Sequence, residues 1–201
     1  MSAFGPESAF MRGLSTTMDS IWINVLLLVT SIPIVTIGAS LTAACDAARR
    51  MNEGRGHLTA NYFRAFRSNF VQSTQLWLII GPIGTLLLLS WIYIQITPLI
   101  ILKIAFSIIW LISFLWVWPM QARFENKVSG TLTKSFLIGM SKIGVTLALA
   151  LVDVIYLALV IASWFYMPSG LFILILFGYG SLIVLHVPLL EYGLRQYTRR
   201  V

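Results

Sequence analysis

The chain has 201 residues, of which 58% are hydrophobic and 10% are charged, and its formal net charge is +7. Soluble domains contain about 25% charged residues, so this composition excludes an ordinary water-soluble globular protein. The single cysteine excludes an intramolecular disulfide, and the two histidines are not spaced like metal ligands. We therefore expect an integral membrane protein that holds neither a metal nor a cofactor.

Five stretches of the chain are long and apolar enough to cross a bilayer. The hydrocarbon core is about 30 Å thick and requires about 20 helical residues. The sequence meets this requirement over residues 21–44, 70–96, 99–120, 143–167 and 171–190. We expect an all-α, polytopic transmembrane helix bundle of about five spans, formed by the whole chain as one membrane domain.

The first expected span contains an unusual stretch, "VTSIPIVTIG". In lipid, proline is tolerated where hydroxyl side chains or neighbouring helices satisfy the freed backbone groups, and Thr36 is such a hydroxyl beside Pro33. Gly38 begins a run of small residues that allows a second helix to approach closely. We expect a kinked helix that packs tightly, and a mobile hinge or ligand groove at Pro33 is the alternative.

Each of the two long connections predicts a basic amphipathic helix at the inner membrane surface. Residues 59–70 place three phenylalanines along one face and two arginines elsewhere. We expect Phe63, Phe66, Phe70, Arg64 and Arg67 to contact lipid or a partner. Arg123, a basic residue of the second connection, is expected to do the same. Residues 131–142 repeat the pattern more weakly.

The distribution of positive charge predicts the orientation. Most of the 14 lysines and arginines fall in the two long connections and in the C-terminal tail, which lie on one side if there are five spans. The positive-inside rule then places the N-terminus outside and the C-terminus in the cytoplasm of a bacterial cell. We expect the basic residues to face anionic headgroups and not nucleic acid, because the chain has no compact basic domain.

Three polar side chains within the spans are candidate functional groups. Asp153 lies about ten residues into the fourth span, where an ionisable group is costly and marks a functional site by default. The alternative is a structural role in helix packing. Lys103 lies nearer the outer boundary and is expected to extend to it, and His186 lies near the cytoplasmic end of the fifth span.

No sequence motif predicts an enzyme. The chain lacks the motifs of serine hydrolases, zinc proteases and nucleotide-binding loops, and we expect it to be non-catalytic. The tripeptide "GYG" at 178–180 is like part of a potassium filter, but no pore helix precedes it. These glycines are expected to allow close helix packing.

Three ordered motifs resemble the YesL-like family of uncharacterised bacterial membrane proteins. They occur in "WINVLLLVTSIPIVTIGASLTA", "YFRAFRSNFVQSTQLWLI" and "WPMQARFEN". The matching positions are Pro33, Thr36 and Gly38; Phe63, Phe66, Asn69 and Phe70; and Pro119, Arg123, Phe124, Glu125 and Asn126. The resemblance implies a polytopic protein of the cytoplasmic membrane whose genes often neighbour those for carbohydrate uptake, and it implies no established activity.

These observations lead to a functional hypothesis with two alternatives. We expect an accessory membrane subunit associated with carbohydrate uptake, whose partners are components of a carbohydrate ABC transporter. The small-residue surface of the first span also fits a homodimer. The alternatives are a small secondary transporter or channel that uses Asp153, and a membrane-anchored regulator.

Overall fold

The computed structural model describes residues 9–124 and 127–198, and within these it contains only helices and their connections. The α-helices are α1 (Ala9–Thr30), α2 (Ile37–Asn52), α3 (Leu58–Tyr93), α4 (Ile100–Arg123), α5 (Val128–Ser141), α6 (Ile143–Tyr166) and α7 (Gly170–Thr198). Two short 3-10 helices, η1 (Ile34–Thr36) and η2 (Thr97–Leu99), lie between them. The predicted all-α polytopic bundle is confirmed.

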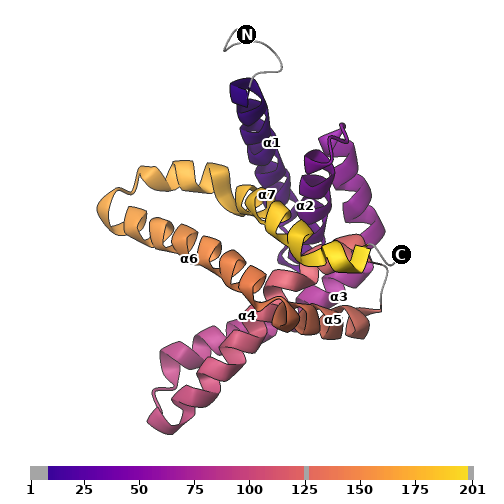
Figure 1. The fold of residues 1–201 in the computed structure, drawn as a ribbon. Coiled ribbons are helices and arrows are strands. Elements are labelled where there is room, and N and C mark those ends of the chain that lie inside the picture. Colours follow the sequence, from indigo (N-terminus) through magenta and orange to yellow (C-terminus); the bar gives the residue numbers. More distant parts are fainter. Residues whose placement is uncertain (1–8, 125–126, 199–201) are drawn as a thin grey trace.

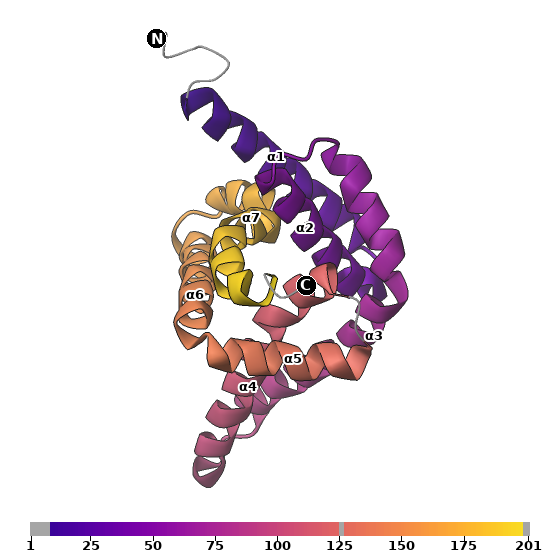
Figure 2. The same cartoon turned by 45° about the vertical axis from the view of Figure 1, so that its right-hand side comes forward.

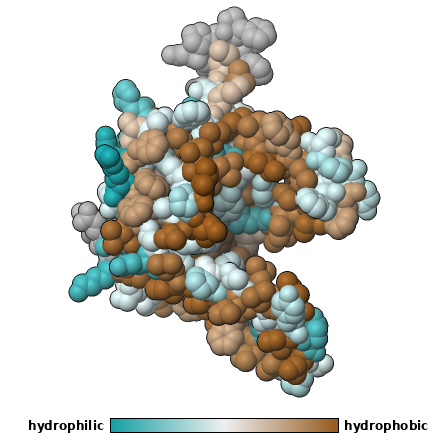
Figure 3. All heavy atoms as spheres, turned by 180° about the vertical axis from the view of Figure 1, so that it is seen from behind, coloured by the Kyte–Doolittle hydropathy of each residue, from teal (hydrophilic) through white to brown (hydrophobic). Residues whose placement is uncertain are grey.

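Five of the described segments are long and apolar enough to cross a membrane, which is the number predicted. They are Gly13–Thr30, Leu58–Tyr93, Thr97–Arg123, Ile143–Tyr166 and Gly170–Arg195. Two helical hairpins, α3–α4 and α6–α7, extend away from the centre of the molecule and end far apart (Figures 1 and 2). Their surfaces are largely apolar, and hydrophilic side chains project from the opposite side (Figure 3). These features fit a multi-pass membrane protein.

The prediction of one continuous span over residues 21–44 is wrong. Helix α1 ends at Thr30, and α2 begins only at Ile37. Between them Pro33 is extended, with φ −75° and ψ 106°, because its ring and missing N–H disfavour a continued helix. The Thr36 hydroxyl donates a hydrogen bond of 2.5 Å to the Thr30 carbonyl. The predicted role of this hydroxyl is therefore confirmed, but at a chain reversal.

After this reversal α2 runs back alongside α1. The indole N–H of Trp22 donates a 2.9 Å hydrogen bond to Thr59, just after the connection that joins α2 to α3. At the C-terminal end of α1, the hydroxyls of Thr30 and Tyr62 lie 2.7 Å apart, and the Tyr62 hydroxyl also donates to the carbonyl of Ser40. The first part of α1 and the α2–α3 connection therefore lie on the same side of the molecule (Figure 1).

The small residues of α2 bring it close to α3, as predicted. A Cβ atom added at Gly38 would lie 2.2 Å from the carbonyl oxygen of Ser73 and 2.6 Å from Trp77 Cβ. Ser73 also donates a buried 2.9 Å hydrogen bond to Thr42. Close approach of the two helices therefore depends on a residue without a side chain at position 38.

The first predicted interfacial helix is not a separate element. Residues 59–70 form the N-terminal third of the 36-residue helix α3, which continues without interruption into the apolar segment. The second is separate: α5 covers most of residues 131–142, and α6 follows directly. Helix α5 packs on α4 at Gly139, where an added Cβ would lie 2.4 Å from Ile112.

Helix α7 is broken at Gly178, inside the predicted fifth span. This residue has φ +46° and ψ −168°, a conformation that side-chain-bearing residues rarely adopt. An added Cβ at Gly180 would lie 2.5 Å from Asn24 Cα, so the predicted packing role is confirmed there. The glycine at 178 has a second role, because it allows the helix to break.

Candidate functional site

Asp153 on α6 and His186 on α7, singled out separately in the sequence, meet inside the bundle. The His186 Nε2 atom lies 3.2 Å from Asp153 Oδ1, and the two side chains are 7% and 20% exposed, respectively. The two atoms are close but not aligned for a hydrogen bond, and neither has a hydrogen-bond partner among the described residues. The arrangement places a half-buried carboxylate beside a buried imidazole.

The surroundings of His186 are aromatic and apolar. The ring of Tyr179 lies edge-on to the imidazole, with 6.5 Å between ring centroids. A cavity of about 10 Å³ lies beside the imidazole, and Cys45 and Trp118 are also in its wall. The indole N–H of Trp118 is buried without a hydrogen-bond partner in the described part of the chain. His186 therefore lines a small cavity whose wall also includes Trp118, a residue with an unpartnered indole N–H.

Lys103 does not join this pair, and its ammonium lies at the turn between α3 and α4. Its side chain is buried, and its ammonium donates hydrogen bonds to the carbonyls of Ser90 and Ile94 at the end of α3. It also lies 5.5 Å from the ring centroid of Trp91. Lys103 therefore caps α3, because the last carbonyls of a helix lack intrahelical donors.

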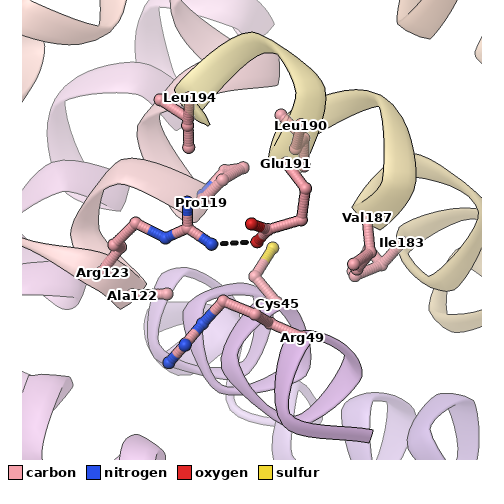
Figure 4. Close-up of a pocket in the computed structure, with 10 residues that line it drawn as sticks. All are labelled: Cys45, Arg49, Pro119, Ala122, Arg123, Ile183, Val187, Leu190, Glu191 and Leu194. Carbon is pink, nitrogen blue, oxygen red and sulfur yellow. Dashed lines mark hydrogen bonds and ion pairs between the residues drawn. The ribbon is translucent and has the colours of Figure 1, made fainter. Parts of the chain in front are cut away.

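A second cavity, of about 20 Å³, lies where α2, α4 and α7 meet. Figure 4 shows the Arg123 guanidinium directed at the carboxylate of Glu191, with the sulfur of Cys45 beside them. The Arg123 side chain is only 11% exposed, and its Nη1 has no hydrogen-bond partner among the described residues. Burial raises the pKa of the Cys45 thiol, and the carboxylate of Asp46 raises it further.

A basic groove of about 600 Å³ lies between α3 and the end of α4. We define it by the residues that line it: Asp46, Arg50, Arg64, Ala65, Arg67, Ser68, Asn69, Val71, Gln72, Gln121, Ala122, Arg123 and Phe124. Arg50 is neutralised by Asp46 at 2.6 Å, and Arg123 by Glu191. Arg64 and Arg67 form no ion pair within the described residues, so the groove has a net positive charge.

Three amide side chains in the wall of the groove form a hydrogen-bond network. The buried Gln121 donates to Gln72 at 2.8 Å and to Asn69 at 3.2 Å, and it accepts a 3.1 Å hydrogen bond from Thr131 on α5. The network links α3, α4 and α5, so it fixes the positions of the groove walls. The sequence prediction missed it, although three amides beside apolar segments are a usable signal.

The predicted contact residues of α3 divide into two kinds. Phe63 and Phe70 are 44% and 37% exposed, whereas Phe66 is partly buried and packs against the core. Arg64 and Arg67 face the groove. Pro33, Thr36 and Gly38 lie at the reversal and the α2–α3 contact, and none of them lines the two cavities or the basic groove.

The end of α4 contacts α7 through an ion pair. Glu191 pairs with Arg123, a contact that the sequence analysis did not predict. Glu125 and Asn126, the last residues of the third motif, lie outside the described residues.

The chain is similar in part to a family of unknown function. A family model described as "Protein of unknown function, DUF624" matches residues 20–91, which extend from α1 to near the end of α3. Comparison with curated proteins gave no match, and comparison with solved structures gave none. The similarity is therefore to an uncharacterised family, and it assigns no activity.

Proposed function

We propose that the protein is a non-catalytic accessory subunit of a carbohydrate uptake system in the bacterial cytoplasmic membrane. The observation that supports this role is the basic groove, which presents Arg64 and Arg67 without ion-pair partners in the described structure. The sequence resemblance to the YesL-like family supports the connection with carbohydrate uptake. The small residues of the first predicted span, expected to fit a homodimer, pack against α3 within the chain, so we propose that a homodimer would form through the exposed apolar helix surfaces instead.

The proposed orientation places the groove in the cytoplasm. Positive charge favours that side, and Arg123 and Glu191 bring the end of α7 to it as well. The reversal at Pro33 puts the first part of α1 on the side of Arg55. We therefore propose that both ends of the described chain face the cytoplasm, in place of the external N-terminus expected from five full crossings. The α1–α2 hairpin then enters the bilayer from the cytoplasmic side.

The proposed occupant of the groove is an acidic cytoplasmic segment of a transporter component. Two unpaired guanidinium groups one helical turn apart can bind carboxylates bidentately, which is stronger than binding by single point charges. The amides of the groove wall supply further donors and acceptors. Anionic lipid headgroups are the competing occupant, because they offer a similar charge.

Affinity purification from native membranes tests this role. The parent chain is compared with an Arg64→Gln/Arg67→Gln variant and with Arg55→Gln, which removes an arginine outside the groove. We expect a transporter component to co-purify with the parent and with Arg55→Gln, and to fall at least about tenfold with the double variant, equivalent to about 1.4 kcal/mol of binding. The proposal fails if no transporter component is enriched with the parent chain.

A further inference from the structure

Asp153 and His186 contact each other where few other polar groups are available. Both residues lie in segments apolar enough to cross a membrane, where an ionisable side chain is costly. The Nε2 and Oδ1 atoms lie 3.2 Å apart, and neither has a hydrogen-bond partner among the described residues. A purely structural polar contact in this environment would be expected to have its remaining capacity satisfied by neighbours.

The ligand that suits these two atoms is a proton. A metal cation requires several oxygen, nitrogen or sulfur ligands, and the described residues contain no group of three or more His, Cys, Asp or Glu side chains that could hold one. A carboxylate and a neutral imidazole together carry one negative charge. One added proton converts them to an imidazolium–carboxylate pair without net charge, which lowers the cost of burial.

Two cavities with common wall residues lie between His186 and the ion pair of Arg123 and Glu191. The inner cavity, of about 10 Å³, includes His186 in its wall, and the outer cavity, of about 20 Å³, includes Arg123 and Glu191. A cavity of at least about 10–15 Å³ can hold one water molecule. The residues common to both walls are Cys45, Pro119, Ile183 and Leu190. The Glu191 side chain is 38% exposed, so the outer cavity adjoins solvent.

The titratable groups around His186 come from several helices. Tyr179 belongs to α7, and Cys45 comes from α2. The wall residues contributed by α4 are not titratable, and on α1 Asn24 bonds only to the α7 backbone. The charged side chains that line the adjoining cavity are Arg49, Arg123 and Glu191. Arg123 pairs with Glu191, and Arg49 pairs with Asp46 and Glu53. Asp153 therefore supplies the carboxylate that lies beside the His186 imidazole, 3.2 Å away.

We propose that Asp153 and His186 form a proton-binding pair, which water reaches from the side of Arg123 and Glu191 through the two cavities. This inference does not depend on the accessory role, because neither Asp153 nor His186 lines the basic groove. It assigns an internal proton site whose charge changes with the pH on one side of the membrane.

Nitrogen NMR of the full chain in lipid nanodiscs tests the pair directly. The chain has two histidines, so His57→Asn, which changes an exposed turn residue, leaves His186 as the only labelled histidine. We expect its ring nitrogens to gain a proton as the pH is lowered across the range in which the protein stays folded. Ring-nitrogen signals that stay constant over this range would overturn the proposal, and this measurement leaves the pair itself intact.

A second variant tests the contribution of Asp153. In the His57→Asn background, Asp153→Asn removes the negative charge but preserves the size of the side chain. We expect the ratio of protonated to neutral His186 at a given pH to fall about tenfold, because an opposite charge at this distance favours the imidazolium. An unchanged ratio in a variant that purifies as folded protein would overturn the assignment of Asp153.

The route is tested by the rate of proton uptake. Cys45→Leu enlarges a side chain in the wall shared by both cavities, whereas Leu137→Met on the exposed face of α5 is the control. After a rapid pH decrease, we expect Cys45→Leu to slow protonation of His186 at least about threefold while its final extent stays the same. Equal rates in the parent, the control and the variant would overturn the proposed route.

Discussion

Asn24 on α1 supplies hydrogen bonds that α7 loses at Gly178. Its side-chain N–H₂ group donates to the carbonyls of Ile175 and Leu176, each at 2.9 Å, and its Oδ1 accepts a 3.1 Å hydrogen bond from the N–H of Gly180. Unsatisfied backbone groups are costly within a membrane, so the broken helix requires this side chain. The contact fixes the part of α7 that leads to His186.

Replacing Asn24 tests this role. Asn24→Ala leaves two carbonyls and one N–H without their side-chain partner, and we expect it to reduce the free energy of unfolding by about 1–3 kcal/mol. Asn52→Ala, at an exposed position at the end of α2, is the matched control. Thermal unfolding of both variants in the same detergent measures the difference, and equal melting temperatures would contradict the proposed role.

The conformation of Gly178 leads to a second prediction. Gly178→Ala places a Cβ on a residue with φ +46°, about 2.1 Å from Asn24 Oδ1, and we expect destabilisation of at least about 1–2 kcal/mol. Gly144→Ala in α6 has no atom within 4 Å of its added Cβ, so it should have no cost. Denaturation curves of the two variants would refute this prediction if their midpoints coincided.

The phenylalanines of α3 are expected to differ in their effect on stability. Phe66→Asp removes a side chain that packs against the core, whereas Phe63→Asp changes one that is 44% exposed. We expect the first change to cost about 1.5–3 kcal/mol more than the second in detergent.

Arg64→Gln/Arg67→Gln should remain folded, because neither guanidinium has an ion-pair partner in the described structure. The test compares yield and melting temperature of all three proteins with those of the parent. A lower melting temperature for the arginine variant than for Phe66→Asp would mean that the groove arginines stabilise the fold.

The raised pKa of Cys45 predicts a dependence of stability on pH. The unfolded chain releases the thiol proton at about pH 8.5, whereas the folded chain retains it to higher pH. The unfolded state then binds fewer protons, so the free energy of unfolding falls as the pH rises above that value. Cys45→Ala should show a smaller fall between about pH 8 and about pH 10. Parallel stability curves for parent and variant would contradict the burial of this thiol.

The number of apolar segments could be predicted because hydrophobic length is a local property of the sequence. The reversal at Pro33 could not, since apolar residues continue on both sides of it and only packing of α2 against α3 distinguishes a turn from a kink. The roles of two nearby residues could nevertheless be predicted: Thr36 supplies a hydroxyl that satisfies a backbone carbonyl, and Gly38 allows close approach of a second helix.

The candidate sites show the same limit. Asp153 and His186 were recognised individually because polar groups in apolar segments are costly, but their contact joins two helices and is a property of the tertiary structure. Asn24 offered the same signal as a lone amide in an apolar run, and it was missed. The positive φ of Gly178 has no equivalent in the sequence pattern.

Photo-crosslinking in native membranes tests the accessory role most directly. A photoreactive residue at Ser68, which lines the basic groove beside Arg67, is compared with one at Leu137, which is 58% exposed on α5. We predict an adduct with a transporter component from position 68 alone, and its loss when Arg64→Gln/Arg67→Gln is added. Adducts only with lipid at position 68, or a protein adduct that persists in the arginine variant, would contradict the account.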